Sequence, residues 1–220
     1  MVVWDENKKV NEYEGHILRR ANVPMYQWIE DKLTPLTDKD VESFKRLQYI
    51  RENLPEFIAS YTNNLIICGK SVGCGKTAWA FKLLLTHISN NWKKIYAEEF
   101  EITDKQFDIA LFLSTIPFLF DLKQFGNNAD ARELYTRAKT TDLLVIDDIV
   151  STEMSRYDYT AIYAIIESRN LAHLPTIFTT NCTTRDEMTK HLGLRLTDRI
   201  WSNAEVIEIT GPSLRGYNKD

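Results

Sequence analysis

Five short apolar runs alternate with segments of helical character along most of this chain, and no other feature of the sequence restricts the fold as strongly. The strand candidates are residues 64–68, 110–114, 142–147, 175–180 and 204–209. Helices are predicted over 76–89, 116–124, 129–139, 156–170 and 183–191, with a short one near 193–202. Apolar strands that alternate with helices are typical of a parallel sheet covered on both faces. We therefore expect an α/β fold built on a five-stranded parallel sheet flanked by helices.

The region before the first strand is divided by prolines. Residues 1–36 mix polar and aromatic residues, with breaks at Pro24 and Pro35, and are expected to form an N-terminal arm or linker. From Asp38 onward apolar residues recur at steps of three, which predicts a helix that Pro55 ends or kinks. The expected division is thus an arm, 1–36, and a main domain, 37–220. For the segment 95–108 a β-hairpin and an extended loop both remain open.

Length, charge, cysteine count and apolar runs together restrict the kind of protein that this chain can be. The chain has 220 residues, of which 44% are hydrophobic, and this is enough for the core of one domain. A net charge of -4 argues against a protein that coats nucleic acid by itself, although a local basic groove stays open. The three cysteines are too few for a disulfide framework or a zinc site. No apolar run approaches the length of a membrane span or signal peptide, so a cytoplasmic protein without a membrane partner is expected.

A glycine-rich loop follows the first strand candidate. The stretch GKSVGCGKT ends as a phosphate-binding loop does, but five residues instead of four separate Gly69 from Gly75. In such loops backbone N–H groups and a helix N-terminus converge on an anion, the lysine neutralises the β- and γ-phosphates, and the following hydroxyl binds Mg²⁺. We expect the extra residue to bulge at Lys70 and Ser71, upstream of the phosphate contacts. The residues predicted to bind ATP or ADP are Gly73, Cys74, Gly75, Lys76, Thr77 and Ala78.

Polar residues end two of the other strand candidates. Because Mg²⁺ needs a carboxylate opposite Thr77, Asp147 in the stretch DLLVIDD is predicted to share the metal with that hydroxyl. The adjacent Asp148 would orient or deprotonate the attacking water. Asn181 ends the stretch TIFTTN and would hydrogen-bond the water or the γ-phosphate, although a lone asparagine there is more often a turn residue.

Taken in order, the segments GKSVGCGKT, LLVIDD, TIFTTN, LGLRLTDRI and ITGPSLRG resemble the AAA+ ATPases. Within them the chain resembles the DnaC/DnaI-type replicative helicase loaders, many of them encoded by phages and prophages. The resemblance covers about residues 61–218. It implies a slow ATPase, stimulated by an oligomer or a partner, that uses ATP and Mg²⁺ and loads a hexameric replicative DNA helicase in DNA replication.

The resemblance also assigns roles by position. Asp148 stands where most AAA+ proteins have the catalytic glutamate, and Asn181 resembles the first sensor. Arg199 resembles the arginine finger that reaches the nucleotide of a neighbouring subunit, with Arg195 as the alternative, and Arg215 resembles the second sensor. The chain ends five residues after Arg215, so the separate C-terminal helical lid of most AAA+ proteins is expected to be absent.

The arm departs from the loader pattern. Residues 1–36 contain no cysteine and one histidine, so the zinc-bearing N-terminal module of some loaders is not expected here. We expect residues 15–34 to pack near the adenine end of the nucleotide site and the first 14 or so to face the helicase. A homo-oligomer and single-stranded DNA stay open as further partners. Two other functions also stay open: an IstB-like helper ATPase of transposition, and a nucleotide-bound inhibitor or adaptor that binds a helicase.

Overall fold

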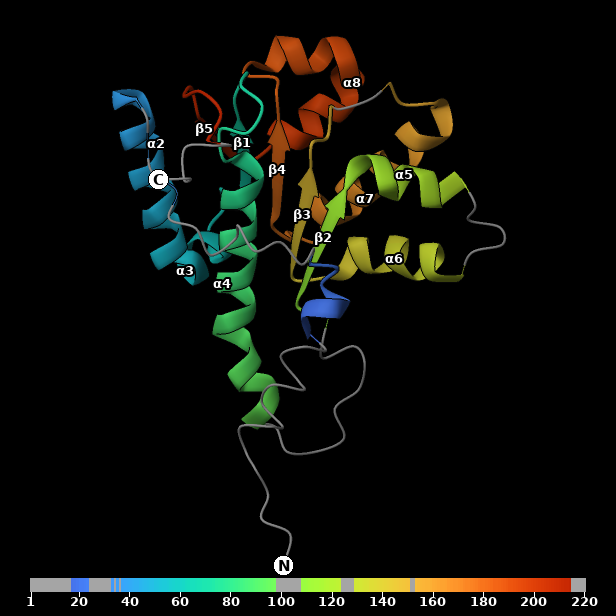
Figure 1. Ribbon diagram of the computed structural model, residues 1–220. Helices are drawn as coiled ribbons and strands as arrows, with labels where there is room; N and C mark the ends of the chain where they lie inside the picture. The colour runs from blue at the N-terminus through green and yellow to red at the C-terminus, as the bar shows by residue number, and fades with distance from the viewer. Residues whose placement is uncertain are drawn as a thin grey trace, which may run out of the picture.

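The computed structural model describes residues 17–23, 33, 35, 37–97, 108–123, 129–150 and 153–214, with the side chains of 92–97 excepted. Its centre is a sheet of five strands, all parallel, in the order β2-β3-β4-β1-β5 (Figure 1). The strands are β1 Asn64–Cys68, β2 Ala110–Ser114, β3 Leu143–Asp147, β4 Thr176–Thr180 and β5 Ala204–Glu208. The five-stranded parallel sheet predicted from the apolar runs is confirmed, with each strand end within one residue of its expected place.

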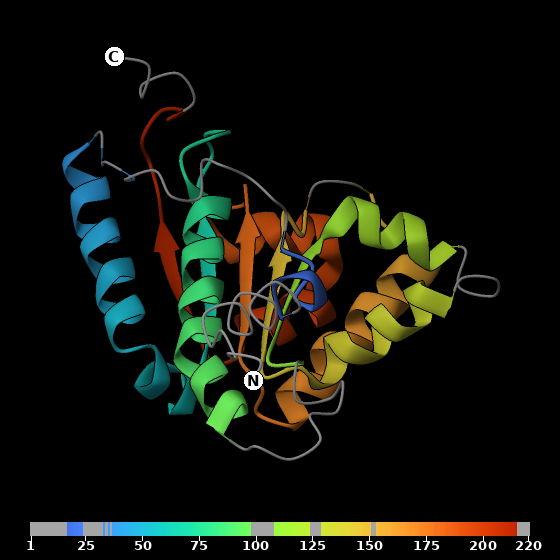
Figure 2. The same ribbon diagram turned by 60° about the horizontal axis from the view of Figure 1, so that its bottom comes forward.

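Helices cover both faces of the sheet. One layer consists of α2 Asp38–Glu52, α3 Leu54–Ala59 and α4 Lys76–Ala97. The other consists of α5 Thr115–Lys123, α6 Ala129–Thr140, α7 Arg156–Leu171 and α8 Arg185–Trp201. In Figure 2 α4 lies in front of the sheet and α7 and α8 lie behind it. Alternate strand residues serve the two layers: Leu65 and Ile67 pack with α2–α4, whereas Ile66 and Cys68 pack with α5–α8. All four of these side chains are fully buried, which is why residues 65–68 of β1 read as an unbroken apolar run.

Local signals fix several helix ends. Thr37 caps α2, because its Oγ1 accepts a hydrogen bond of 3.2 Å from the backbone N of Asp40. Pro55 lies in the first turn of α3, so the predicted break after α2 is confirmed. The two helices expected on either side of residue 192 are both present within α8, and they meet at a kink at Gly193, whose φ of 72° and ψ of 160° are not helical. The ambiguous segment 95–108 is helical up to Ala97, and 98–107 lie outside the described residues.

A piece of the expected arm belongs to the core. The side chains of Ile17 and Ala21 are fully buried among α4 and the sheet. Beside them, the N–H of Phe112 in β2 donates to Ala21 O at 2.8 Å, and Asn22 Nδ2 donates to Phe112 O at 3.0 Å. Residues 17–23 thus satisfy backbone groups on the open edge of β2, the strand farthest along the sheet from β1.

The expectation that residues 15–34 pack at the adenine end of the site is therefore wrong for 17–23. An unpaired strand edge, together with Asp108, decides where this segment docks. Asp108 Oδ1 accepts from Arg20 Nε at 3.1 Å and from Arg137 Nε at 2.7 Å. Leu33, in contrast, does lie beside the glycine-rich loop, close to Gly75.

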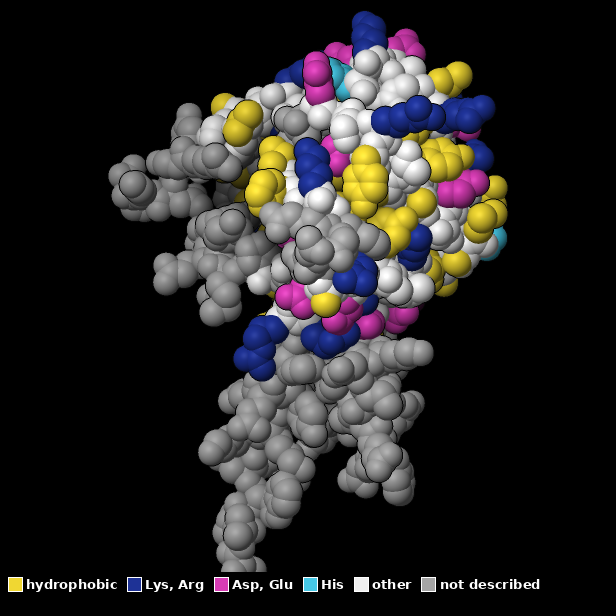
Figure 3. All heavy atoms as spheres, turned by 90° about the vertical axis from the view of Figure 1, so that its right-hand side faces the viewer, with side chains coloured by type: hydrophobic (Ala, Val, Ile, Leu, Met, Phe, Trp, Pro, Cys, Tyr) yellow, Lys and Arg dark blue, Asp and Glu magenta, His cyan; other side chains and the backbone are white. Residues whose placement is uncertain are grey.

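The surface of the molecule carries both apolar and charged side chains. On the face that carries α5 and α6, apolar side chains lie between Lys or Arg and Asp or Glu side chains (Figure 3). Ile116 and Phe120 of α5 and Tyr157 of α7 are each more than half exposed. Within the described part of the chain, no helix combines the length and the apolar character that crossing a membrane requires.

Candidate functional site

The topology of the sheet marks one place for a ligand. Strands β1 and β4 are neighbours, yet the chain leaves them in opposite directions. From β1 it crosses one face through α4 to β2, and from β4 it crosses the other face through α8 to β5. Open α/β sheets bind ligands at the carboxyl ends of such a pair. The glycine-rich loop 69–75 and Asn181 follow these two strands, and Asp147 ends the next strand, β3.

The glycine-rich loop has the backbone of a cradle. Gly73 and Gly75 have φ values of 81° and 106°, a region that favours glycine. A Cβ on Gly69 would meet the carbonyl oxygen of Ile209, so no larger residue fits there. The loop is held at both ends: Gly69 N donates to Thr180 O at 3.2 Å, and Gly73 O accepts from Leu214 N at 2.8 Å. It leads directly into α4, whose N-terminus adds a positive dipole end.

Lys76 carries a buried positive charge with neutral partners. Its side chain donates to Gly69 O and Ser71 O, each at 2.9 Å, and its Nζ lies 3.7 Å from Cys74 Sγ. Lys76 is 9% exposed, and among the described residues no carboxylate lies within ion-pair distance of it. A buried cation is costly unless it is paired. The arrangement therefore favours an anion at this point, and a phosphate fits it.

The extra residue of the loop lies toward the surface. Lys70 is exposed and forms an ion pair with Glu187 in the first turn of α8. Val72 is 66% exposed, whereas Cys74 is fully buried. The inner part of the loop, from Gly73 through Thr77 and Ala78, thus leads without interruption into α4.

Thr77 and Asp147 are brought together, as a shared metal requires. Asp147 Oδ1 accepts a hydrogen bond from Thr77 Oγ1 at 2.8 Å and another from Thr179 Oγ1 at 2.6 Å. Burial raises the pKa of Asp147, and the two hydroxyl hydrogen bonds partly oppose this. Mg²⁺ is usually held by one or two carboxylates plus substrate phosphates. No cluster of three or more metal-ligating His, Cys, Asp or Glu side chains occurs within the described ranges, and such a magnesium site needs none.

Thr179 also belongs to this site by its contacts, and it was not predicted from the sequence. Its hydroxyl joins the two strand ends, because it donates to Asp147 and accepts from the backbone N of Asp148 at 2.8 Å. Its backbone oxygen also accepts from Ile149 N at 3.1 Å. The available signal was a hydroxyl residue two positions before Asn181 in the run TIFTTN.

Asp148 has an unusual backbone and a shifted pKa. Its φ of 56° lies in the left-handed region, which asparagine and aspartate tolerate better than most residues. Burial raises its pKa, the charge of Asp147 raises it further, and Lys76 lowers it. Such a perturbed carboxyl at the end of a central strand is typical of a functional group.

The remaining predicted site residues are one asparagine and three arginines. Asn181 is exposed immediately after β4. Arg199 does not join the site of its own chain, because it lies in the last turn of α8, toward the amino end of β5. There it forms an ion pair with Glu167 of α7, and this contact raises its pKa. Arg195 is exposed and makes no ion pair with the described residues, and Arg215 lies outside them.

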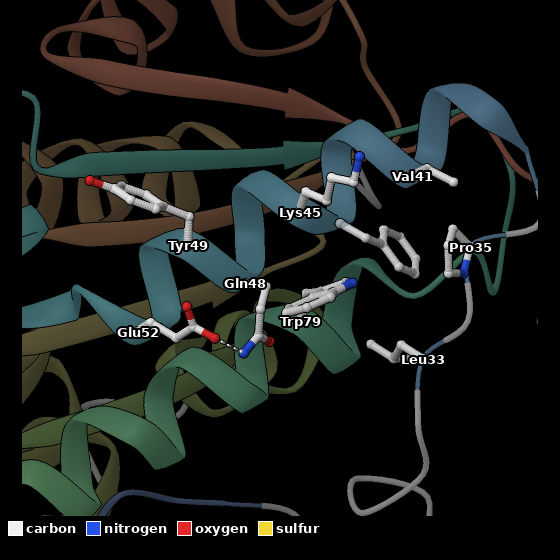
Figure 4. A pocket seen from close by; sticks show the side chains of 9 residues that line it. Leu33, Pro35, Val41, Lys45, Gln48, Tyr49, Glu52 and Trp79 are labelled. Carbon is white, nitrogen blue, oxygen red and sulfur yellow. Dashed lines mark hydrogen bonds between the residues drawn. The ribbon is translucent and has the colours of Figure 1, made fainter.

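A pocket of about 530 Å³ lies between α2 and α4, close to the loop (Figure 4). Its lining is mainly apolar and aromatic and consists of Leu33, Pro35, Val41, Phe44, Lys45, Gln48, Tyr49, Glu52 and Trp79. Trp79 is buried edge-to-face against Phe44, with ring centroids 5.3 Å apart. Its indole Nε1 has no hydrogen-bond partner in the described structure. Leu33 belongs both to this lining and to the surroundings of Gly75, so the pocket adjoins the loop.

The comparisons with known proteins agree with this geometry. No family model and no curated protein matches the chain. Among solved structures, it is similar to a DnaC helicase loader, with 22% identity, a TM-score of 0.64 and coverage of 82% of this chain and 95% of that one. A structure of DnaI has 21% identity, a TM-score of 0.61 and coverage of 87% and 94%.

A third similar structure is the replication initiator DnaA bound to AMPPCP and single-stranded DNA. It has 16% identity and a TM-score of 0.59, and the match spans 82% of this chain but only 49% of DnaA. Identities at this level establish the fold. The predicted likeness to DnaC/DnaI-type proteins is thereby confirmed in its architecture, because the chain shares the α/β fold of these solved structures.

Proposed function

We propose that this chain is an AAA+ ATPase of DNA replication that binds Mg²⁺-ATP and helps to load a hexameric replicative helicase. The observation that carries the proposal is the charge arrangement of the site. A buried Lys76, with no carboxylate partner among the residues that the structure describes, lies at a loop with two left-handed glycines, and the next residue, Thr77, is hydrogen-bonded to Asp147. The similar DnaA structure holds AMPPCP, and this supports a nucleoside triphosphate as the ligand.

Binding would use the groups of the loop in sequence. The Lys76 ammonium would exchange Gly69 O and Ser71 O for phosphate oxygens, while the backbone amides from Gly73 to Ala78 donate to the phosphates. Thr77 and Asp147 would hold Mg²⁺, which supplies charge neutralisation at the β- and γ-phosphates. The apolar pocket beside Gly75 is of a size and character that suits a purine base.

Hydrolysis would depend on residues at the ends of β3 and β4. Asp148 would accept the proton of the attacking water, and Asn181 would orient that water or the γ-phosphate. Because Arg199 lies away from the site of its own chain, it would complete the site of a neighbouring subunit. Aspartate is one methylene shorter than glutamate, so we propose slow turnover that rises when subunits are aligned.

The helicase-binding surface is proposed to lie in the first residues of the arm, which fall outside the described residues. Deleting residues 2–12 should leave ATP binding intact and weaken capture of the replicative helicase in a pull-down with ATP. Deleting through Trp28 also removes Ile17 and Ala21 from the core, so that variant should be destabilised as a whole. Full helicase capture by the short deletion would place docking on the ATPase domain, where Ile116 and Phe120 expose apolar surface.

The same pull-down distinguishes the alternatives. A loader should bind the helicase in an ATP-dependent manner and increase the helicase loaded on DNA. An inhibitor or adaptor should bind the helicase and reduce its activity or leave it unchanged. An IstB-like helper should bind double-stranded DNA and not the helicase, and the net charge of -4 counts mildly against this.

A further inference from the structure

Two contacts join the start of the glycine-rich loop to the end of β4 and to the segment that follows it. The first is the backbone hydrogen bond from Gly69 N to Thr180 O, 3.2 Å long. The second is the ion pair between Lys70 and Glu187. Glu187 in turn accepts from the segment itself, because its Oε2 receives the N–H of Thr183 at 2.9 Å.

These contacts close a ring around Asn181. The ring runs from Gly69 to Thr180, through Asn181 and Cys182 to Thr183, and returns through the Glu187 and Lys70 side chains. Asn181 is exposed, but the backbone on each side of it is fixed to the loop by one of the two contacts. Its orientation therefore depends on where the first two residues of the loop lie.

The start of the loop is also the part that phosphate binding would disturb. In the present conformation Lys76 donates to Gly69 O and Ser71 O, the residues on either side of Lys70. When the ammonium turns to a phosphate, both carbonyls lose this donor. A rearrangement there reaches Lys70, which the five-residue spacing before Gly75 places at the surface, facing α8.

We propose that Lys70 and Glu187 are positioning residues that couple the conformation of the phosphate loop to the orientation of Asn181. The extra residue of the loop then has a function, since it allows Lys70 to reach Glu187. The hydrolytic consequence rests on the proposed ATPase function, whereas the coupling of Lys70 to residues 181–183 does not.

The alternative is an ordinary surface ion pair, which stabilises by little and positions nothing. The structure favours a positioning role because the Glu187 carboxylate makes two further contacts with Thr183. Besides the bond to Thr183 N, the hydroxyl of Thr183 lies 3.4 Å from the same oxygen. The contacts of Glu187 with Lys70 and Thr183 lower its pKa to about 2, so the carboxylate stays charged throughout the working pH range.

The test compares Lys70→Ala, Lys70→Arg and Glu187→Gln with the wild type in the full chain. Amide hydrogen exchange of residues 181–183 is measured without nucleotide, and ATP affinity and kcat are measured separately. We expect exchange in Lys70→Ala to rise about two- to fivefold, the range that an exposed ion pair can supply, with kcat falling by a similar factor and Kd within twofold. Lys70→Arg should restore both values, and Glu187→Gln should resemble Lys70→Ala.

Arg185→Ala provides the matched control. It removes another exposed ion pair of α8, Arg185 with Asp198 at 2.5 Å, which has no contact with the loop, and it should change neither readout. If the amides of residues 181–183 exchange at the same rate in Lys70→Ala as in the wild type, the inference is overturned. A large loss of ATP affinity in Lys70→Ala would also overturn it, because Lys70 would then contact the nucleotide directly. If the wild type binds no ATP, the proposed function fails, and the exchange result alone decides whether Lys70 positions Asn181.

Discussion

Replacing Asp148 with asparagine should have opposite effects on stability and on catalysis. Asparagine keeps the size of the side chain and tolerates the φ of 56°, so the backbone should not change. In the free protein the substitution removes a half-buried carboxylate whose pKa is raised by burial and by Asp147. A raised carboxyl pKa means that the folded state is penalised once the pH exceeds that pKa.

The expected changes in unfolding free energy and in kcat can be estimated from the surroundings of Asp148. Because Asp148 is half-exposed and solvent screens its charge, we expect a gain of only about 0.5 kcal/mol in unfolding free energy at pH 7. For a domain of this size that corresponds to about 1–2 °C in Tm. The gain should shrink as the pH falls through the raised pKa, since the wild-type carboxyl then becomes neutral. Loss of a general base should lower kcat by a factor of about 10²–10⁴.

The assay is thermal unfolding of the nucleotide-free protein between pH 5 and pH 8, together with kcat and Kd for ATP. Asp142→Asn is the matched control, because burial also raises the pKa of Asp142, which lies at the other end of β3. That variant should leave kcat unchanged. A kcat for Asp148→Asn within twofold of the wild type would refute the role of Asp148 in hydrolysis. A clear loss of stability at pH 7 would refute the electrostatic reasoning.

Three further predictions concern other parts of the molecule. Arg199→Ala should abolish the rise of specific activity with protein concentration and leave ATP affinity nearly unchanged; an arginine finger is worth about 10³–10⁵ in rate, and activity indifferent to this change would exclude a trans role. Arg169→Met should lower the free energy of unfolding, measured by chemical denaturation, by at least about 3 kcal/mol. The fully buried guanidinium donates to Thr176 Oγ1 and to three backbone carbonyls, and all four acceptors would lose their donor. EDTA should weaken ATP binding to the wild type much more than to Asp147→Asn, and equal weakening would show that Asp147 does not hold the metal.

Strands β1, β2 and β3 could be predicted from sequence because each is a short, mainly apolar run, whereas β5 mixes apolar and acidic residues and is only partly buried. The parallel arrangement buries both faces of a strand, so burial and sequence pattern coincide. The Thr77–Asp147 contact was predictable for a related reason. Residues that follow parallel strands meet at one edge of the sheet, and Mg²⁺ requires a hydroxyl and a carboxylate there.

Contacts between distant segments could not be read from local pattern. Nothing in the arm sequence indicates that Ala21 and Asn22 hydrogen-bond to Phe112, because that contact exists only once β2 has an open edge. The break between two helices near residue 192 was predicted, and the structure has it as a kink at the non-helical Gly193. The link from Lys70 to Glu187 depends on the path of the loop past α8, which spacing alone does not define.

Calorimetric titration of the folded wild-type chain with Mg²⁺-ATP shows whether the glycine-rich loop binds nucleotide. We expect a Kd in the micromolar range, because Lys76 is a buried cation whose present partners are neutral. Lys76→Ala should abolish or strongly weaken this binding, whereas Lys190→Ala, which removes an exposed lysine of α8, should leave it unchanged. Absence of binding heat for wild-type protein, or equal binding by Lys76→Ala, would contradict the assignment of a nucleotide site to this loop.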